Sequence, residues 1–196
     1  MTRIAMIQGH PTPGRGHFCH ALADAYAQGA EQAGHEVRHV PVAGLDFPLL
    51  RSRGDWEGVE PPAAIAQAQQ TILWAEHLVI LYPLWLGSMP ALLKGFLEQV
   101  LRPAFMAGEA GARVGTGWKS VLKGRSARII VTMGMPALVY RWYFGAHSLR
   151  SLERNILSFA GIRPNRHTLI GMVEGVSDSK RRAWLEAMRD LGRAGR

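Results

Sequence analysis

The feature that most constrains the fold is a regular alternation between short apolar segments and longer segments with helical periodicity. Three of the apolar segments are nearly continuous runs, which is typical of parallel strands covered on both faces. Strands are predicted over residues 3–8, 36–42, 77–82, 127–133 and 165–173. Because helical patterns separate these strands, the chain is predicted to be α/β, with a doubly wound parallel sheet, right-handed crossovers and helices on both faces.

The predicted helices are bounded by residues that suit helix ends. A helix over 18–33 is expected to stop at Gly34, where a glycine can adopt the left-handed conformation. Ser148 is expected to cap a later helix, and Ser177 or Asp178 to cap the last one. The 196 residues are expected to form one domain, 1–196.

Two connections are longer than usual, 44–58 and 102–124, and we expect them to be functional or mobile. No apolar stretch approaches the ~20 residues that cross a bilayer, and the N-terminus has no signal-peptide pattern. Cys19 is the only cysteine, which excludes internal disulfides and cysteine metal clusters. A cytoplasmic protein without a metal site and without stable membrane insertion is therefore expected.

The net charge of +8 is unevenly distributed along the chain. Sixteen basic and five acidic side chains follow residue 112, whereas acidic side chains are in excess before it. This asymmetry is compatible with an anionic partner, and equally with a solvated arginine-rich surface. A nucleic-acid-binding module would need aromatic residues interleaved with the basic ones, and Trp142, Tyr143 and Phe144 follow only Arg141. We therefore expect no nucleic-acid partner.

The first candidate site is the loop over residues 9–19, between the first predicted strand and helix. It holds three glycines, two prolines, an arginine and two histidines. Ligands of open parallel sheets bind beyond the carboxyl ends of the strands, and the start of a helix together with Arg15 suits a phosphate. The loop matches neither a P-loop nor the dinucleotide fingerprint. A structural turn is the alternative, and Cys19 is interpreted as an inert small residue.

Two further loops follow the third and fourth predicted strands. Residues 82–90 are apolar and aromatic, which suits either the wall of a flat ligand site or a plug between helices. In the other loop, Thr132 offers a hydroxyl and Gly134 a closely approaching backbone. Tyr140 and His147 follow in an aromatic setting, where an imidazole can stabilise negative charge near neutral pH. For each of these two side chains a structural hydrogen bond is the alternative.

Taken together, the three loops resemble the NAD(P)H:quinone oxidoreductase (DT-diaphorase) branch of the flavodoxin-like superfamily. This branch also includes bacterial modulators of drug activity and ancillary subunits of glutathione-gated potassium efflux systems. The resemblance covers nearly the whole chain, and its most specific part is Pro83-Leu84-Trp85 with the block 89–96. The other matching segments are 9–11 with Phe18, 101–105, 117–124, and 132–134 with Tyr140 and His147.

The resemblance implies a five-stranded sheet of order 2-1-3-4-5 and a bound flavin, FAD or FMN. It implies that the flavin phosphate is held by His10, His17, Phe18 and Cys19. It implies that the isoalloxazine ring faces Pro83, Leu84, Trp85, Leu86 and Gly87. It implies that the polar edge of the ring contacts Thr132, Met133, Gly134 and Met135. The family often has Ser-Phe-Asn where this chain has His17-Phe18-Cys19, and Arg15 lies in an insertion where it can replace the lost ligands.

The resemblance further implies an oxidoreductase in which Tyr140 and His147 are catalytic. It would pass two electrons from NAD(P)H to a quinone-like acceptor by ping-pong turnover, with NADH or NADPH left open. The family is typically a homodimer with the site at the subunit interface. One alternative is a flavin-binding regulatory subunit of a glutathione-gated potassium efflux transporter, and the second is the basic nucleic-acid-binding module.

Overall fold

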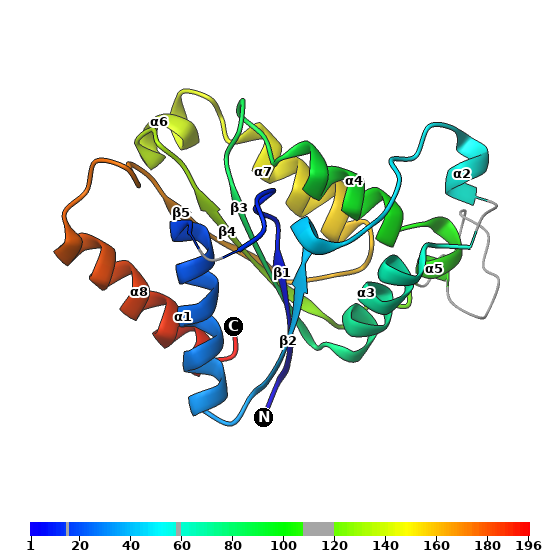
Figure 1. Ribbon diagram of the computed structural model, residues 1–196, viewed down its shortest axis with the longest axis horizontal. Coiled ribbons are helices and arrows are strands. Elements are labelled where there is room, and N and C mark those ends of the chain that lie inside the picture. The colour runs from blue at the N-terminus through cyan, green and yellow to red at the C-terminus, as the bar shows by residue number, and fades with distance from the viewer. Residues whose placement is uncertain (15, 58–59, 108–119) are drawn as a thin grey trace.

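The computed structural model describes residues 1–14, 16–57, 60–107 and 120–196, which form a five-stranded parallel sheet with helices on both faces (Figure 1). The strands are β1 (Arg3–Gln8), β2 (Glu36–Pro41), β3 (His77–Pro83), β4 (Ser126–Thr132) and β5 (Asn165–Ile170). Their order is β2-β1-β3-β4-β5, and all neighbouring strands are parallel. This confirms the predicted class and the order implied by the resemblance.

The continuous apolar runs arise because the central strands are buried on both faces. In β3, Leu78 and Ile80 pack into one core, while Val79 and Leu81 pack into the other. Successive side chains of a strand point to opposite faces, so a strand between two helical layers needs apolar residues at every position. The residues of β1 and β4 divide between the two cores in the same way.

Two helical layers cover the sheet (Figure 1). One face carries α1 (Phe18–Gln32) and α8 (Asp178–Arg193). The other carries α3 (Ala63–Trp74), α4 (Ala91–Val100) and α7 (His147–Ser151), which continues as a π-helical segment, η3 (Leu152–Ser158). The short helices are η1 (Val42–Gly44), α2 (Arg53–Glu57), α5 (Pro103–Ala107) and α6 (Ala137–Trp142). Within the described ranges, no helix is long and apolar enough to cross a membrane.

Some predicted boundaries are confirmed and others are wrong. Gly34 follows the end of α1 with a φ of +79°, and the Ser177 side chain accepts the backbone N–H of Lys180 at the start of α8. Ser148 is not a helix cap, because α7 already begins at His147. Helix α6 was not predicted, because its six residues are too few to show the helical period of apolar residues.

The last strand is shorter than predicted because the chain turns at its end. Residue 172 has a φ of +59°, and its backbone N–H donates to the carbonyl of Met135 (3.1 Å). The next N–H, of Val173, donates to the carbonyl of Met133 (3.2 Å). Residues 171–173 are therefore fastened to the loop after β4 and do not extend β5. The long connections contain α2 and α5, while residues 58–59 and 108–119 of them lie outside the described part of the chain.

Helices α1 and α8 touch through two glycines. A Cβ placed on Gly29 would lie 2.1 Å from the carbonyl oxygen of Arg189, and one on Gly192 would lie 2.1 Å from the carbonyl oxygen of Tyr26. Real Cβ atoms do not approach backbone this closely, so only glycine allows the two helices to pack at this distance. The contact lies in the C-terminal halves of both helices and sets how closely they pack on this side of the sheet.

Arg125 fastens α3 to the segment before β4. Its guanidinium donates to the carbonyl oxygens of Leu73 (2.6 Å), Ala75 (2.9 Å) and Val121 (2.7 Å). The last carbonyls of a helix have no hydrogen-bond donor within the helix. At the end of α3, Arg125 provides these donors. The predicted role of an arginine surplus as surface charge therefore does not apply to this residue.

Candidate active site at the carboxyl ends of the strands

A cavity of about 570 Å³ opens where β1, β3 and β4 end. Its volume lies within the range of small-molecule sites, and its position is the one expected for a ligand of an open parallel sheet. The lining residues are His10, Thr12, Gly16, His17, Phe18, Cys19, Pro83, Trp85, Thr132, Val173, Glu174 and Arg181. All three loops that the sequence singled out therefore meet at one cavity.

The structure brings seven of the predicted cofactor residues onto this wall. They are His10, His17, Phe18, Cys19, Pro83, Trp85 and Thr132. The other predicted residues of the second and third loops lie within three positions of a lining residue in sequence but do not line the cavity themselves. They are Leu84, Leu86, Gly87, Met133, Gly134 and Met135. Arg15 lies outside the described residues.

The first loop begins tightly packed on the sheet. The backbone N–H of Gly9 donates to the carbonyl of Leu81 in β3 (2.7 Å). A Cβ at Gly9 would lie 3.0 Å from that carbonyl oxygen and 2.6 Å from Leu93 of α4. A side chain at this position would push the loop away from the sheet. The glycine therefore keeps the start of the first loop close to β3.

The start of α1 provides the polar end of the cavity. His17 occupies the cap position with extended backbone, its side chain makes no capping hydrogen bond, and the first turn contains no acidic residue. The N–H groups at a helix start carry partial positive charge and favour an anion. Arg181 of α8 faces the same cavity and lies over the Phe18 ring, 5.8 Å from its centroid. These groups give the cavity a cationic end, although the Glu174 carboxylate also lines the cavity.

Cys19 and Thr132 connect the first loop with the end of β4. Burial raises the pKa of the Cys19 thiol to about 12, although its hydrogen bond with the Thr132 side chain opposes this rise. The thiol is therefore neutral at physiological pH and is not a nucleophile, since the thiolate is the reactive form. This agrees with its interpretation as an inert residue and leaves Cys19 a packing role in the wall.

The aromatic loop after β3 is a tight two-residue hairpin. Trp85 and Ser88 exchange both backbone hydrogen bonds, at 2.8 and 2.9 Å. The two residues between them have positive φ, +46° at Leu86 and +75° at Gly87, as a type I′ turn requires. A leucine in this conformation is strained, and its side chain is fully exposed. Such strain is concentrated at binding sites, and here it holds the half-exposed Trp85 at the cavity.

The two predicted catalytic residues have different surroundings. His147 is exposed at the start of α7. Tyr140 lies in α6 with 1% of its surface exposed, and its hydroxyl is hydrogen-bonded to the Ser148 hydroxyl (2.8 Å). Neither side chain lines the cavity between the strand ends. Their catalytic role remains a prediction.

One wall of the cavity was missed by the sequence analysis. Val173 and Glu174 follow β5, and Arg181 lies one turn into α8. The signal was available, because the carboxyl end of β5 must lie at the same edge of the sheet as the other carboxyl ends. Because the strand was predicted to extend to residue 173, the loop that begins after residue 170 was not recognised as part of this wall.

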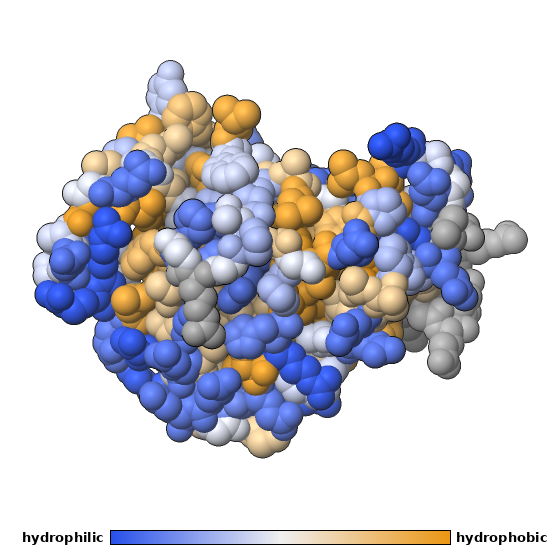
Figure 2. Space-filling view, viewed as in Figure 1, coloured by the Kyte–Doolittle hydropathy of each residue, from blue (hydrophilic) through white to orange (hydrophobic). Residues whose placement is uncertain are grey.

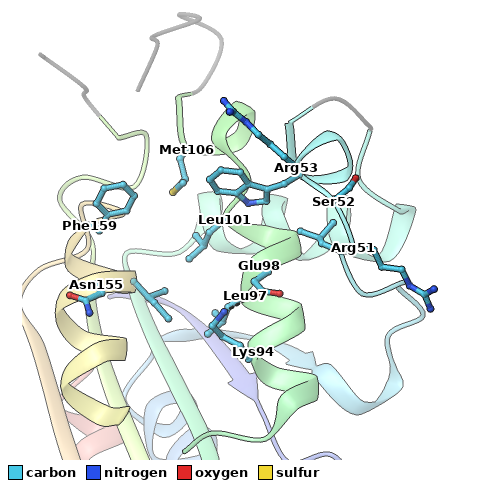
Figure 3. A pocket seen from close by; sticks show the side chains of 13 residues that line it. Arg51, Ser52, Arg53, Lys94, Leu97, Glu98, Leu101, Met106, Asn155 and Phe159 are labelled. Atoms are coloured by element: carbon cyan, nitrogen blue, oxygen red, sulfur yellow. Dashed lines mark hydrogen bonds and ion pairs between the residues drawn. The ribbon is translucent and has the colours of Figure 1, made fainter. Parts of the chain in front are cut away.

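A second cavity of about 550 Å³ lies among α2, α4, α5 and η3 (Figure 3). Phe159 and Asn155 lie on one side of it, and Leu97 of α4 and Leu101, the residue after α4, lie on the other (Figure 3). Its lining contains none of the residues predicted to bind a cofactor. Because it is remote from the ends of β1 and β4, we place the cofactor site at the first cavity.

The fold and the cavity together define a flavodoxin-like α/β protein with its ligand site at the carboxyl edge of the sheet. Residues 2–192 match the family described as having the flavodoxin-like fold, and the chain belongs to this family.

Relatives of known description resemble the chain over most of its length. An NAD(P)H oxidoreductase of Haemophilus influenzae, itself uncharacterized, is 27% identical over 186 residues, covering 92% of this chain and 89% of the relative. An FMN-dependent NADH:quinone oxidoreductase of Ruegeria pomeroyi is 26% identical over 150 residues, 69% of this chain and 72% of the relative.

Solved structures show the same fold. An NAD(P)H:quinone oxidoreductase from Methanothermobacter marburgensis superposes with a TM-score of 0.79 at 22% identity, covering 98% of this chain and 96% of that one. An FMN-dependent NADH-azoreductase from Bacillus anthracis, solved in complex with FMN, gives a TM-score of 0.74 at 14% identity, with 98% of each chain covered. At these identities the likeness establishes the fold.

Proposed function

We propose that this protein is an FMN-dependent NAD(P)H oxidoreductase that reduces quinone-like acceptors by two electrons. The observation that carries the proposal is one cavity, at the carboxyl edge of a flavodoxin-like sheet, that is lined both by the aromatic Trp85 and by the start of α1 with Arg181. The names of the relatives from Haemophilus influenzae and Ruegeria pomeroyi support the reaction class, and the latter and the Bacillus anthracis complex support FMN.

The residues present fit a flavin mononucleotide. A phosphate would lie at the start of α1, where His10 and His17 offer imidazole donors and Arg181 offers a fixed positive charge. A planar ring would lie against Trp85, with the Thr132 hydroxyl available to a polar edge. The cavity lining thus combines positively charged groups suited to a phosphate with an aromatic surface suited to a ring.

When bound, the flavin supplies the two-electron redox chemistry. The protein's part is to hold and orient it and to keep water from the reacting face. Pro83 at the end of β3 and Trp85 in the hairpin provide apolar surface for this. We propose that NAD(P)H and the acceptor use the open side of the ring in turn, which gives ping-pong turnover.

Tyr140 and His147 are retained in the proposal as the residues that serve the acceptor. The imidazole of His147 is exposed and can donate to an acceptor oxygen as this oxygen gains charge. The Tyr140 hydroxyl is bonded to Ser148, so we propose that it acts by fixing the start of α7, on which His147 lies. The two residues therefore have separable roles.

A homodimer and a cytoplasmic location complete the proposal. Leu138, Trp142 and Tyr143 of α6 and the adjoining segment are 68%, 75% and 82% exposed. Figure 2 shows apolar surface at the upper edge of the molecule, over α6 and the end of β3. Apolar patches of this kind mark interaction surfaces, and a second copy would cover this one. Sedimentation should then show twice the monomer mass of 21.6 kDa, and a monomer alone at micromolar concentration would contradict this part.

The reaction is tested by turnover. Protein reconstituted with FMN should oxidise NADH or NADPH rapidly when a benzoquinone is present, and Trp85→Ala should bind FMN more weakly than a Leu49→Ala control. Leu49 is also exposed but lies outside the cavity. FMN binding without appreciable turnover would contradict the proposed oxidoreductase activity and favour the alternative of a regulatory subunit.

A further inference from the structure

Three histidines gather at the cationic end of the cavity. The rings of His10 and His17 are stacked, with centroids 4.1 Å apart and an interplanar angle of 23°. His20, one turn into α1, lies edge-on to both, at 4.9 Å from His10 and 5.7 Å from His17. Only His10 and His17 line the cavity, so His20 forms a second layer behind them.

Two of the three rings are buried, whereas His17 is exposed at the cavity. His10 and His20 are 7% and 6% exposed. Nδ1 of His10 accepts the backbone N–H of Thr12 (3.1 Å), so the neutral ring carries its proton on Nε2. Nδ1 of His20 is buried and has no hydrogen-bond partner among the residues that the structure describes. An imidazole in this state has a free nitrogen that can take up a proton.

The charged groups around the cluster are few. Asp24, one turn further along α1, favours a charged His20. Glu174 and Arg181 approach the cavity from the β5 side with opposite charges, and the Cys19 thiol stays neutral. Among the described residues, no group of three or more histidine, cysteine or acidic side chains is placed to hold a metal ion. Because the cluster lies at the start of α1, where the backbone N–H groups favour an anion, it is a candidate site for an anion.

Without an anion, the two buried rings, those of His10 and His20, resist protonation. Burial lowers the pKa of His10, and the neighbouring imidazoles of His17 and His20 lower it further. Burial and His17 likewise lower the pKa of His20, and Asp24 opposes this effect. A phosphate dianion beside the cluster would raise the pKa of these imidazoles, because an opposite charge within a few ångströms favours the charged imidazole.

We propose that His10, His17 and His20 form a proton-linked recognition site for a phosphate monoester, so that FMN binding takes up protons and its affinity falls as the pH rises. The inference rests on the proposed flavin site and specifies how its phosphate end works. Linkage fixes the sign: if the bound state holds more protons than the free state, lower pH favours binding. Riboflavin, which lacks the phosphate, would bind more weakly and without this dependence.

The test compares the dissociation constants of FMN and riboflavin at pH 6.5 and 8.5, measured by flavin fluorescence. One proton taken up over part of this range should weaken FMN binding by about tenfold, whereas complete uptake of one proton would give about tenfold for each pH unit. The constant for riboflavin should change by less than about twofold. Calorimetry in two buffers of different ionisation enthalpy should show proton uptake with FMN only.

Variants separate the cluster from other causes of pH dependence. His17→Ser combined with His20→Gln should still bind FMN, but with a pH dependence like that of riboflavin. His39→Gln, an exposed histidine on β2, should behave as the wild type. FMN binding that is flat across this pH range, or a dependence unchanged in the double variant, would overturn the inference and leave the proposed function intact. Failure of both flavins to bind would overturn the proposed function and the inference with it.

Discussion

Replacing Gly29 with alanine should loosen the pair of helices that carries the cationic end of the site. The added methyl would lie 2.1 Å from the carbonyl oxygen and 2.7 Å from the Cα of Arg189. Both contacts are with backbone, so no rotamer change relieves them, and α8 must move by about 1 Å to restore ordinary packing.

The magnitude follows from two opposing effects. Overpacking of this kind costs about 1–3 kcal/mol, and the backbone clash places it at the upper end. Alanine regains about 1 kcal/mol relative to glycine inside a helix. The net loss of unfolding free energy is therefore about 2 kcal/mol, which lowers the Tm of a chain of this length by about 4–8 °C. FMN binding should weaken too, because α8 carries Arg181.

Thermal unfolding followed by circular dichroism measures the effect. Gly44→Ala is the matched control, because a Cβ there meets nothing within 4 Å and the backbone has no positive φ. Gly192→Ala should resemble Gly29→Ala, and the double variant should lose less than the sum, since one separation of the helices relieves both clashes. A Tm of Gly29→Ala equal to that of the control would refute the close contact.

Three other predictions concern the site and the core. His147→Ala should lower turnover with a quinone about tenfold at unchanged flavin content, and Tyr140→Phe should lower turnover less. If stopped flow shows wild-type rates of both half-reactions in both variants, the two residues are structural. Arg125→Met should lower the unfolding free energy, measured by urea denaturation, by about 2–3 kcal/mol, because it removes the donors at the end of α3. A change below about 0.5 kcal/mol would show that water replaces these hydrogen bonds. Burial lowers the pKa of His77 to about 4, so its contribution to stability is complete above pH 6.5 and is lost as the pH falls from 6.5 toward 4. Urea unfolding at pH 7 and pH 5 should therefore show a smaller acid loss for His77→Gln than for wild type or His39→Gln, and equal losses would remove His77 as a cause.

The parts of the fold that followed from the sequence are those with a strong local signal. The apolar runs of β1, β3 and β4 predicted buried parallel strands, and Gly34 marked the end of α1. The helix α6 had no such signal, because only Tyr140 of its residues is buried and its six residues span less than two turns.

The site was predictable where chemistry and topology coincide. His10, Trp85 and Thr132 lie on loops that follow neighbouring strands, and parallel strands bring such loops to one edge. Arg181 reaches the cavity through the packing of α8 on α1, which depends on glycines that carry no ligand-binding signal. The edge-on packing of His20 against the other imidazoles was equally hidden, because it depends on the path of the loop between residues 10 and 17.

The identity of the bound cofactor tests the central claim most directly. Purified protein, or protein mixed with flavin and then freed of excess, should show visible flavin absorbance, and mass spectrometry after denaturation should identify the released molecule as FMN. Titration should give saturable FMN binding at micromolar concentration or below. Absence of binding by both FMN and FAD at micromolar concentrations would contradict the account.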